Sequence, residues 1–112
     1  MAIDLNGSTG ISLDDNEKIN IGNDSDLQIY HDGSHSYIVD AGTGNMYIST
    51  DGNGIVMQAS LSETMFAALP NGAVTLYHDN AAKLVTTATG IDVTGTAVMD
   101  GLTLGANNAN SP

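Results

Sequence analysis

Apolar and polar residues alternate one by one along two short stretches of the chain, 27–31 and 74–78. This period of two is typical of a β-strand that turns one face towards a core and the other towards solvent. Each stretch runs into a residue pair that tolerates positive φ, Asp32-Gly33 in the first case and Asp79-Asn80 in the second. We therefore expect two β-hairpins. Their returning strands are predicted at residues 36–39 and 82–86.

The middle of the chain shows the same order of strand, turn and strand. Residues 44–50 predict a strand, 51–54 a turn of Asp, Gly and Asn, and 55–59 the returning strand. Residues 60–69 are also predicted to form a strand. A helix is the alternative there, because helical spacing fits Leu61, Met65, Ala68 and Leu69 as well. Pro70 and the following Asn71-Gly72 end the element in either case.

The clearest organisational signal is an internal repeat. The segment LQIYHDGSHSYI at 27–38 aligns without gaps to VTLYHDNAAKLV at 74–85. The identical residues are Tyr30, His31 and Asp32 in the first copy and Tyr77, His78 and Asp79 in the second. Repeated supersecondary units cannot bury their apolar faces alone and usually stack or wrap into an elongated body. We expect one β-rich module over residues 1–105 that contains both repeats.

Towards the C-terminus, small polar and β-branched residues alternate with regular glycines. This cadence covers 89–98 and returns at 101–105. It suits narrow strands from several chains that approach closely around an axis, because glycine permits close backbone contact. An ordinary edge strand followed by a flexible segment is the alternative. Residues 106–112 are small and polar, and we expect a flexible tail there.

The composition leaves little material for a core within one chain. Among 112 residues there are one Phe, four Tyr, no Trp and no Cys. A small chain that lacks large apolar residues and disulfides commonly gains stability by oligomerising. The sequence therefore predicts partners.

The charge excludes several classes of partner. The thirteen acidic residues face only Lys18 and Lys83, and the formal net charge is -11. A surface of this sign repels phosphate, so we expect neither nucleic-acid binding nor an anionic membrane partner. No stretch has the length of a membrane span, and the start of the chain lacks the basic and apolar regions of a signal peptide. We expect the chain to be made in the cytoplasm.

Three segments resemble bacteriophage tail-fibre and virion-appendage proteins of the kind found in marine phages. They are KINIGNDSDLQIYHDGSHSYI at 18–38, GTGNMYIS at 42–49 and NGAVTLYHDNAAKLVTTATGIDVTGT at 71–96. The resemblance implies an all-β, elongated, repeat-containing structure built of hairpins, a β-prism or a triple-stranded β-helix. It also implies an intertwined homotrimer whose chains share one core.

The resemblance further implies a structural role in the virion, as a segment of a tail fibre or stem, with other virion proteins as partners. Three alternatives stay open. In these alternatives the chain is a capsid or tail decoration, a receptor-binding module for host glycans, or a subunit that polymerises into a filament.

Metal-ligand residue types lie close together at His31, Asp32 and His35. A metal needs three or more converging ligands, which one strand and turn supply only if the side chains fold back or if several chains meet. The structural interpretation is preferred, with Tyr packing, His hydrogen-bonding and Asp fixing its turn. Asp24 and Asp26, like Asp51 further on, lack the closing Glu of an EF-hand. We expect no cofactor, with a loose calcium site or another bound cation as the alternative.

No enzyme motif occurs, neither GxSxG nor HExxH, P-loop or Rossmann glycines. Carboxylate pairs such as Asp14 with Asp15 are expected to lie in solvated turns, and we predict no enzymatic activity. Exposed tyrosines stack well on sugar rings. Tyr37 and Tyr47 are the candidates for contact with host surface carbohydrate.

Overall fold

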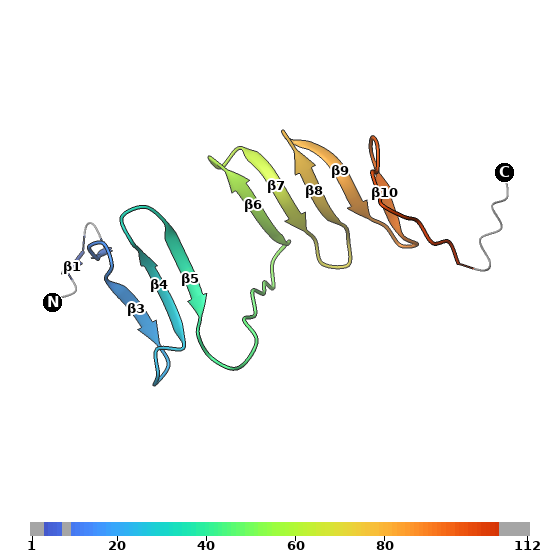
Figure 1. Cartoon of the computed structure of the whole chain (residues 1–112). Coiled ribbons are helices and arrows are strands. Elements are labelled where there is room, and N and C mark those ends of the chain that lie inside the picture. Colours follow the sequence, from blue (N-terminus) through green and yellow to red (C-terminus); the bar gives the residue numbers. More distant parts are fainter. Residues whose placement is uncertain (1–3, 8–9, 106–112) are drawn as a thin grey trace. The chain divides into compact units, whose positions relative to one another are not determined.

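The computed structural model describes residues 4–7 and 10–105. Within these residues the chain folds into ten short β-strands and contains no helix, so the predicted all-β class is confirmed (Figure 1). The described part of the chain accordingly holds no helix with the length and apolar character needed to cross a membrane. The predicted tail, 106–112, lies outside the described residues.

The chain divides into two compact units, 1–48 and 49–112, here called unit 1 and unit 2. One copy of the sequence repeat lies in each unit. Unit 1 contains a two-stranded antiparallel ribbon and a three-stranded antiparallel sheet of order β3-β4-β5. Their strands are β1 (Asp4–Asn6), β2 (Gly10–Ser12), β3 (Lys18–Ile21), β4 (Leu27–His31) and β5 (Ser36–Asp40).

Unit 2 is a five-stranded antiparallel sheet of order β10-β9-β8-β7-β6, in which each strand pairs with its neighbours in the sequence. Short connections favour this meander, because closing a short loop costs little entropy. The strands are β6 (Ile55–Ala59), β7 (Glu63–Ala68), β8 (Val74–His78), β9 (Ala81–Thr86) and β10 (Ile91–Val93).

Both predicted hairpins are present, as β4-β5 and β8-β9. Residues 63–68 form a strand, so the strand prediction for this region is confirmed and the helical alternative is wrong. A tight turn precedes this strand, with Ser60 at φ +53° and Leu61 at φ +58°. Pro70 and Asn71, with Asn71 at φ +53°, form the next turn, in which the Gly72 N–H donates to the Leu69 carbonyl over 3.1 Å.

The strand predicted at 44–50 is wrong. These residues form no ladder, and all of their side chains are exposed. The expected partner, β6, pairs instead with β7, which the turn at 60–62 places beside it. Alternating residues alone do not make a strand, because the backbone N–H and C=O groups need a partner strand.

The glycine-rich C-terminal region contains one strand, β10, at the edge of the five-stranded sheet. The alternative of an edge strand therefore holds for residues 91–93. Residues 94–105 form no strand within the chain. The predicted winding of several chains around an axis stays a prediction.

One face of the five-stranded sheet carries two adjacent rows of residues that are almost wholly apolar. Residues directly opposite one another in an antiparallel pair share a face, as do residues two apart in one strand. One row of partners therefore comprises Met57, Phe66, Leu76, Leu84 and Val93. The next row on the same face comprises Ile55, Ala68, Val74, Thr86 and Ile91. We call these ten residues the apolar face of unit 2.

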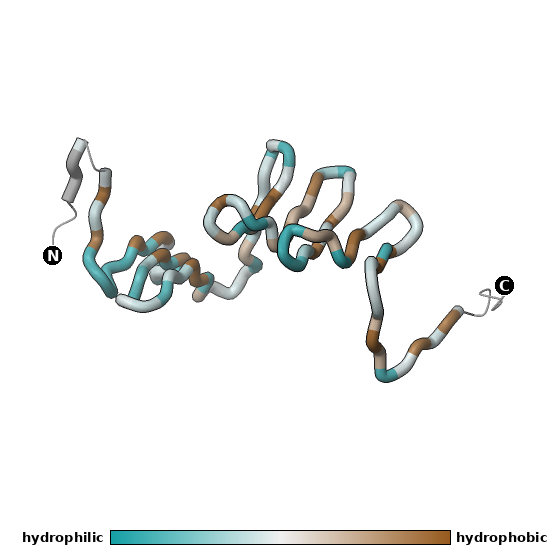
Figure 2. Tube along the Cα trace, turned by 90° about the horizontal axis from the view of Figure 1, so that it is seen from above, coloured by the Kyte–Doolittle hydropathy of each residue, from teal (hydrophilic) through white to brown (hydrophobic). Residues whose placement is uncertain are grey.

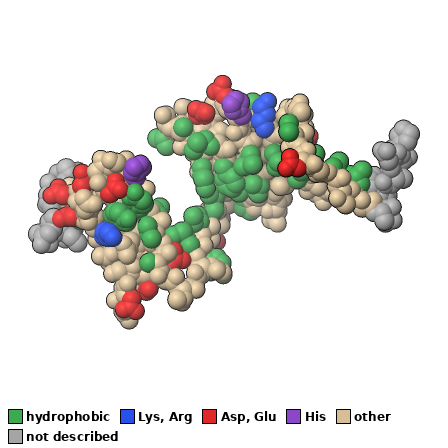
Figure 3. All heavy atoms as spheres, viewed as in Figure 1, with side chains coloured by type: hydrophobic (Ala, Val, Ile, Leu, Met, Phe, Trp, Pro, Cys, Tyr) green, Lys and Arg blue, Asp and Glu red, His purple; other side chains and the backbone are tan. Residues whose placement is uncertain are grey.

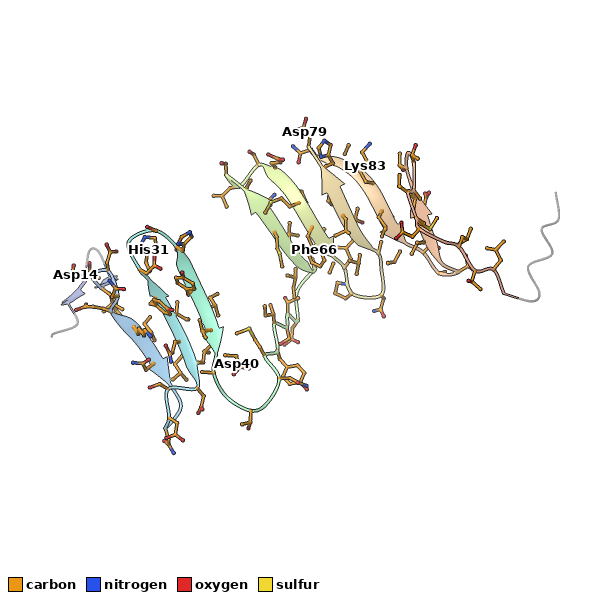
Figure 4. The ribbon with its side chains drawn as sticks, in the orientation of Figure 1. Asp14, His31, Asp40, Phe66, Asp79 and Lys83 are labelled. Carbon is orange, nitrogen blue, oxygen red and sulfur yellow. The ribbon has the colours of Figure 1, made fainter. Side chains whose placement is uncertain are left out.

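Figure 2 shows the alternation that produces this face, as brown apolar positions recur along the strands. In Figure 3 the hydrophobic side chains gather over the strands from β6 to β9. Phe66, labelled in Figure 4, lies within this region. The single hydroxyl of the face, on Thr86, accepts a hydrogen bond from the Val74 N–H over 2.9 Å. The face therefore carries no charge and no unused polar side chain.

Two β-bulges lie next to the central row of this sheet. Met57 pairs with Phe66 and Gln58 with Thr64, so Met65 is the extra residue in β7. Leu76 pairs with Leu84 and Tyr77 with Ala82, so Lys83 is the extra residue in β9. Bulges bend a strand and increase its twist, so the β6-β7 and β8-β9 pairs both bend beside this row.

The three-stranded sheet of unit 1 also has two different faces. Ile19, Ile29 and Ile38 lie opposite one another in one row, and the next row of the same face comprises Ile21, Leu27 and the charged Asp40. The other face carries Lys18, Tyr30, Tyr37, Asn20, Gln28 and Val39. One face is thus mainly aliphatic and the other mainly polar and aromatic.

Among residues 10–105 no side chain is buried, apolar or polar. Ile29 in the central strand β4 keeps 38% of its surface exposed, and Leu76 in the central strand β8 keeps 45%. In ordinary domains Ile and Leu are among the residues most often fully buried. The sheets therefore have the alternation of core-forming elements without a core above them.

Candidate functional site

The turn of the first repeat copy is organised by Asp32. Its Oδ1 accepts hydrogen bonds from the backbone N–H groups of Ser34 (2.9 Å) and His35 (2.8 Å), and its Oδ2 accepts one from the Tyr37 hydroxyl (2.9 Å). The backbone closes the same turn, since the Asp32 N–H donates to the His35 carbonyl over 3.1 Å. Gly33 lies at φ +94°, a conformation that a residue without Cβ adopts without strain.

These contacts change the acidity of both partners. The backbone N–H groups of His35 and Ser34 and the Tyr37 hydroxyl stabilise the carboxylate and hold the pKa of Asp32 below its ordinary value of 3.8. The same bond to the Asp32 carboxylate raises the pKa of Tyr37, because ionised tyrosine cannot donate this hydrogen bond. Asp32 is therefore a turn-stabilising anion, and its oxygens are occupied by donors of the chain itself.

The polar face of the unit 1 sheet carries an aromatic stack. The rings of Tyr30 and Tyr37, on directly opposite positions of β4 and β5, lie 4.7 Å apart with 16° between their planes. Lys18 Nζ lies 4.5 Å from the centroid of the Tyr30 ring and donates a hydrogen bond to Gln28 Oε1 over 2.8 Å. Stacked aromatic pairs and cation–π contacts each contribute about 0.5 to 1.5 kcal/mol. The stack therefore stabilises the sheet.

The three candidate metal ligands of this turn do not converge on one point. His31 Nδ1 lies 3.1 Å from Ser36 Oγ, while His35 Nδ1 lies 3.8 Å from Asp32 Oδ1. Figure 4 places His31 at the turn end of β4. Among residues 4–7 and 10–105 no three His, Cys, Asp or Glu side chains lie together as a metal site requires. The structure thus brings Asp32 and His35 together and leaves His31 on a separate partner.

The second repeat copy forms a different turn. Asp79 and Asn80 lie at φ +50° and +61°, the conformation of a two-residue type I′ hairpin turn. The side chain that reaches outside this turn belongs to Asn80, whose Oδ1 accepts the Thr64 N–H over 2.7 Å. His78 pairs with Ala81, the residue directly after the turn, whereas His31 pairs with Ser36 across a four-residue turn. Identical Tyr-His-Asp residues therefore precede two unlike turns.

The acidic segment around Asp24 also serves a turn. The Ser25 N–H donates to the Gly22 carbonyl over 3.3 Å, and the Ser25 carbonyl accepts from Gln28 Nε2 over 3.1 Å. The Asp26 carbonyl accepts the Ala41 N–H over 2.6 Å. Asp14 likewise sits in a turn with Glu17, whose Oε2 accepts the Asp14 N–H over 3.1 Å. Of these contacts, the one to Glu17 uses a carboxylate, and the turn around Asp24 is held by backbone groups and the Gln28 amide.

The two candidate sugar-contacting tyrosines have opposite surroundings. Tyr37 stacks on Tyr30 and bonds Asp32, so one ring face and its hydroxyl are engaged within the chain. Tyr47 lies in the loop after β5 and exposes 83% of its surface. An open cavity of about 220 Å³ lies beside it, lined by Leu27, Asp40, Asn45, Met46 and Tyr47.

Sequence reasoning identified Tyr47 but missed the other residues of this cavity. Asp40 ends β5, and Asn45 and Met46 belong to the segment that was expected to be a strand. No spacing of residues in the sequence predicts that this loop and Leu27 of β4 line one cavity. The nearest available signal is the run of polar and small residues at 40–45, which marks a loop.

Comparisons of the chain with models of known protein families, with curated proteins and with solved structures found no match. The function is therefore argued from the geometry of the chain.

Proposed function

We propose that this chain is a structural, non-enzymatic subunit of a bacteriophage virion appendage, a tail-fibre or stem segment, that acts by assembling as a homotrimer. The observation that carries the proposal is the lack of any buried side chain among residues 10–105, although rows of apolar side chains cross both the three-stranded and the five-stranded sheet. A soluble chain that leaves such faces open needs a partner to cover them. In this proposal the function of the chain is to assemble into the appendage.

The apolar face of unit 2 supports this proposal by its size. Fully burying one large aliphatic or aromatic side chain contributes about 1.5 to 3 kcal/mol. The face carries eight such side chains, already half-covered by their neighbours: Ile55, Met57, Phe66, Val74, Leu76, Leu84, Ile91 and Val93. Covering the rest contributes on the order of 10 kcal/mol per chain. That is comparable with the whole stability of an ordinary domain, so covering this face decides whether the sheet persists.

The charge distribution favours copies of the same chain as the cover. A chain of net charge -11 repels its own copies wherever acidic side chains face one another. The apolar face of unit 2 carries no charged residue, and the isoleucine row of unit 1 carries none either. Closed cyclic symmetry brings the same patch of each subunit to a common axis. Copies can therefore meet through these faces with their acidic residues kept in solvent.

The trimeric state and the virion location rest on the resemblance of residues 18–38, 42–49 and 71–96 to phage fibre proteins. In this proposal the chain is made in the host cytoplasm and becomes part of the virion, with other virion proteins as partners. A capsid or tail decoration, a glycan-binding module and a filament-forming subunit are the alternative roles. All of them share the need for a covered apolar face.

The experiment is to measure the solution mass by light scattering over a dilution series, with negative-stain imaging of the same sample. A constant mass of three chains and uniform short particles support the trimeric appendage. A mass that grows with concentration, together with rods of variable length, replaces the closed trimer by a filament. A compact monomer at all concentrations overturns the proposal.

A further inference from the structure

Two Asn-Gly pairs lie in unit 2, one before its first strand and one between two of its strands. Asn53-Gly54 directly precedes β6, and Asn71-Gly72 belongs to the turn between β7 and β8. Both asparagine side chains are exposed to solvent. Asparagine is among the thermolabile residues of proteins, and a glycine that follows it has no Cβ to shield its backbone nitrogen. The sequence alone therefore makes both pairs candidates for the same chemical modification.

The backbone amide of the glycine differs between the two pairs. The Gly72 N–H donates a hydrogen bond to the Leu69 carbonyl over 3.1 Å, and the Leu69 N–H donates to the Ala73 carbonyl over 3.1 Å. These two bonds close the turn that contains Asn71. Within the described part of the chain, the Gly54 N–H makes no hydrogen bond. The nitrogen of Gly54 is therefore available for reaction, whereas the nitrogen of Gly72 is held by its partner.

The place of Gly54 at the start of an edge strand accounts for its unbonded amide. The strand β6 has β7 on one side and no strand of the sheet on the other (Figure 1). A backbone N–H that points away from β7 therefore meets no partner strand. Gly54 lies at φ +150°, and a Cβ added to it would clash with the carbonyl oxygen of Ala68. The fold thus requires glycine directly after Asn53.

We propose that Asn53 is a site of spontaneous deamidation and that the hydrogen bond of Gly72 protects Asn71. The deprotonated nitrogen of Gly54 attacks Cγ of Asn53, the bond from Cγ to Nδ2 breaks, and ammonia leaves with the proton that the glycine nitrogen lost. The product is a five-membered succinimide ring. Water then opens the ring at either carbonyl and gives aspartate or isoaspartate. In sum, one amide and one water become one carboxylate and one ammonium ion, so water is the sole co-reactant.

The modification changes both the charge and the backbone at the start of β6. The new carboxylate makes the net charge of -11 more negative by one charge. Isoaspartate also adds one carbon to the main chain shortly before Ile55, where the ladder with β7 begins. Asn53 is not among the ten residues of the apolar face of unit 2, so the reaction can be measured whether or not other copies cover that face. Failure of deamidation and failure of trimerisation are therefore separate results.

Ageing of the full chain in a mildly alkaline buffer tests the proposal. Chymotrypsin cleavage after Tyr47, Phe66 and Tyr77 places the two asparagines in different peptides. Mass spectrometry of these peptides separates the amide from the acid, and aspartate from isoaspartate. We expect acid to accumulate at least about tenfold faster at Asn53 than at Asn71, because the loss of one backbone hydrogen bond raises a barrier by an amount of this order.

Two controls separate the effect of the fold from the effect of the sequence. In denaturant, where the Gly72 N–H loses its partner, the rates at Asn53 and Asn71 should approach each other. Asn53→Gln should stop the formation of acid at this position, because glutamine would have to close a less favourable six-membered ring, and should leave the rate at Asn71 unchanged. Amide NMR spectra check that this variant keeps the fold, which the exposure of Asn53 favours.

Equal rates at both asparagines of the folded chain overturn the proposal. A ratio of rates that is the same in the folded and the unfolded chain also overturns it, since the sequence alone would then explain the difference. Formation of aspartate at Asn53 without isoaspartate contradicts the succinimide route, because direct hydrolysis of the side chain needs no attack by the Gly54 nitrogen.

Discussion

At the scale of single residues, Asp32 does the most for local structure in unit 1. Its carboxylate accepts three hydrogen bonds, and its pKa is lowered mainly by the backbone N–H groups of His35 and Ser34. A group whose pKa is lower in the folded state than in the unfolded state stabilises the fold at pH values above its unfolded pKa. This stabilisation disappears as the pH falls through the folded pKa.

The pH dependence of stability should therefore reveal Asp32. We expect Asp32→Ala to lower the unfolding midpoint at about pH 6, and the difference from the wild type to shrink below the ordinary pKa of 3.8. Chemical denaturation between about pH 6 and about pH 2 measures this difference. Tyr37→Phe removes one donor and keeps both backbone donors, so it should lose only part of the effect. A difference that stays constant down to about pH 2 would contradict this role of the carboxylate.

Leu61 is strained at its position. It lies at φ +58° in the turn between β6 and β7, and its side chain is 89% exposed. The left-handed conformation costs a residue with a Cβ roughly 1 to 2 kcal/mol, which glycine avoids, although glycine loses more entropy on folding. We expect Leu61→Gly to stabilise the fold by about 0.5 to 1 kcal/mol in equilibrium unfolding. Ser62→Gly, in the same turn at negative φ, should destabilise it, and the same sign for both variants would refute the explanation.

At the scale of elements, the two faces of the five-stranded sheet should respond differently to charge. Met57 and Gln58 are neighbours in β6 and are both exposed, but Met57 lies on the apolar face of unit 2 and Gln58 on the other face. We expect Met57→Glu to weaken self-association at least about tenfold, because a buried unpaired carboxylate costs several kcal/mol. Gln58→Glu adds the same charge and should change the association little. Sedimentation equilibrium of both variants decides, and equal effects would show that the apolar face is not the contact surface.

Local patterns in the sequence were sufficient to predict the hairpins. The alternation at 27–31 and 74–78 and the residues of the turns after them act over a few positions, so they can be found without a structure. The partner and the register of each strand cannot be predicted from such local patterns. Residues 44–50 alternate like a strand and yet have no partner, and the extra residues Met65 and Lys83 depend on the register that neighbouring strands adopt.

The candidate sites differ in the same way: contacts within one hairpin could be predicted, and contacts between segments far apart in the sequence could not. The bond from Tyr37 to Asp32 links residues five apart on one hairpin, and the aspartate that fixes its turn was predicted as such. The Tyr47 cavity was not predictable as a unit, because Leu27 and Asn45 meet only when the loop after β5 folds back towards the start of β4. The repeat predicted similar turns, but the first copy reverses over four residues and the second over two.

At the scale of the whole molecule, charge and apolar surface oppose each other. Each chain carries a net charge of -11, so self-association brings like charges closer together. Salt shortens the range of this repulsion to about 8 Å at 0.15 M ionic strength and about 3 Å at 1 M. We expect the dissociation constant of the oligomer to fall several-fold between these two salt concentrations. A marked rise measured by light scattering would mean that ion pairs, and not apolar faces, hold the subunits together.

The most direct test of the central claim is the dependence of thermal unfolding on protein concentration. A chain whose apolar faces are covered by its own copies has no folded monomer of comparable stability, so its melting temperature must rise with concentration. We predict such a rise from nanomolar to micromolar chain concentration, with loss of β-structure at the lowest concentrations. A folded monomer that persists at nanomolar concentration, with an unchanged melting temperature, would contradict the account.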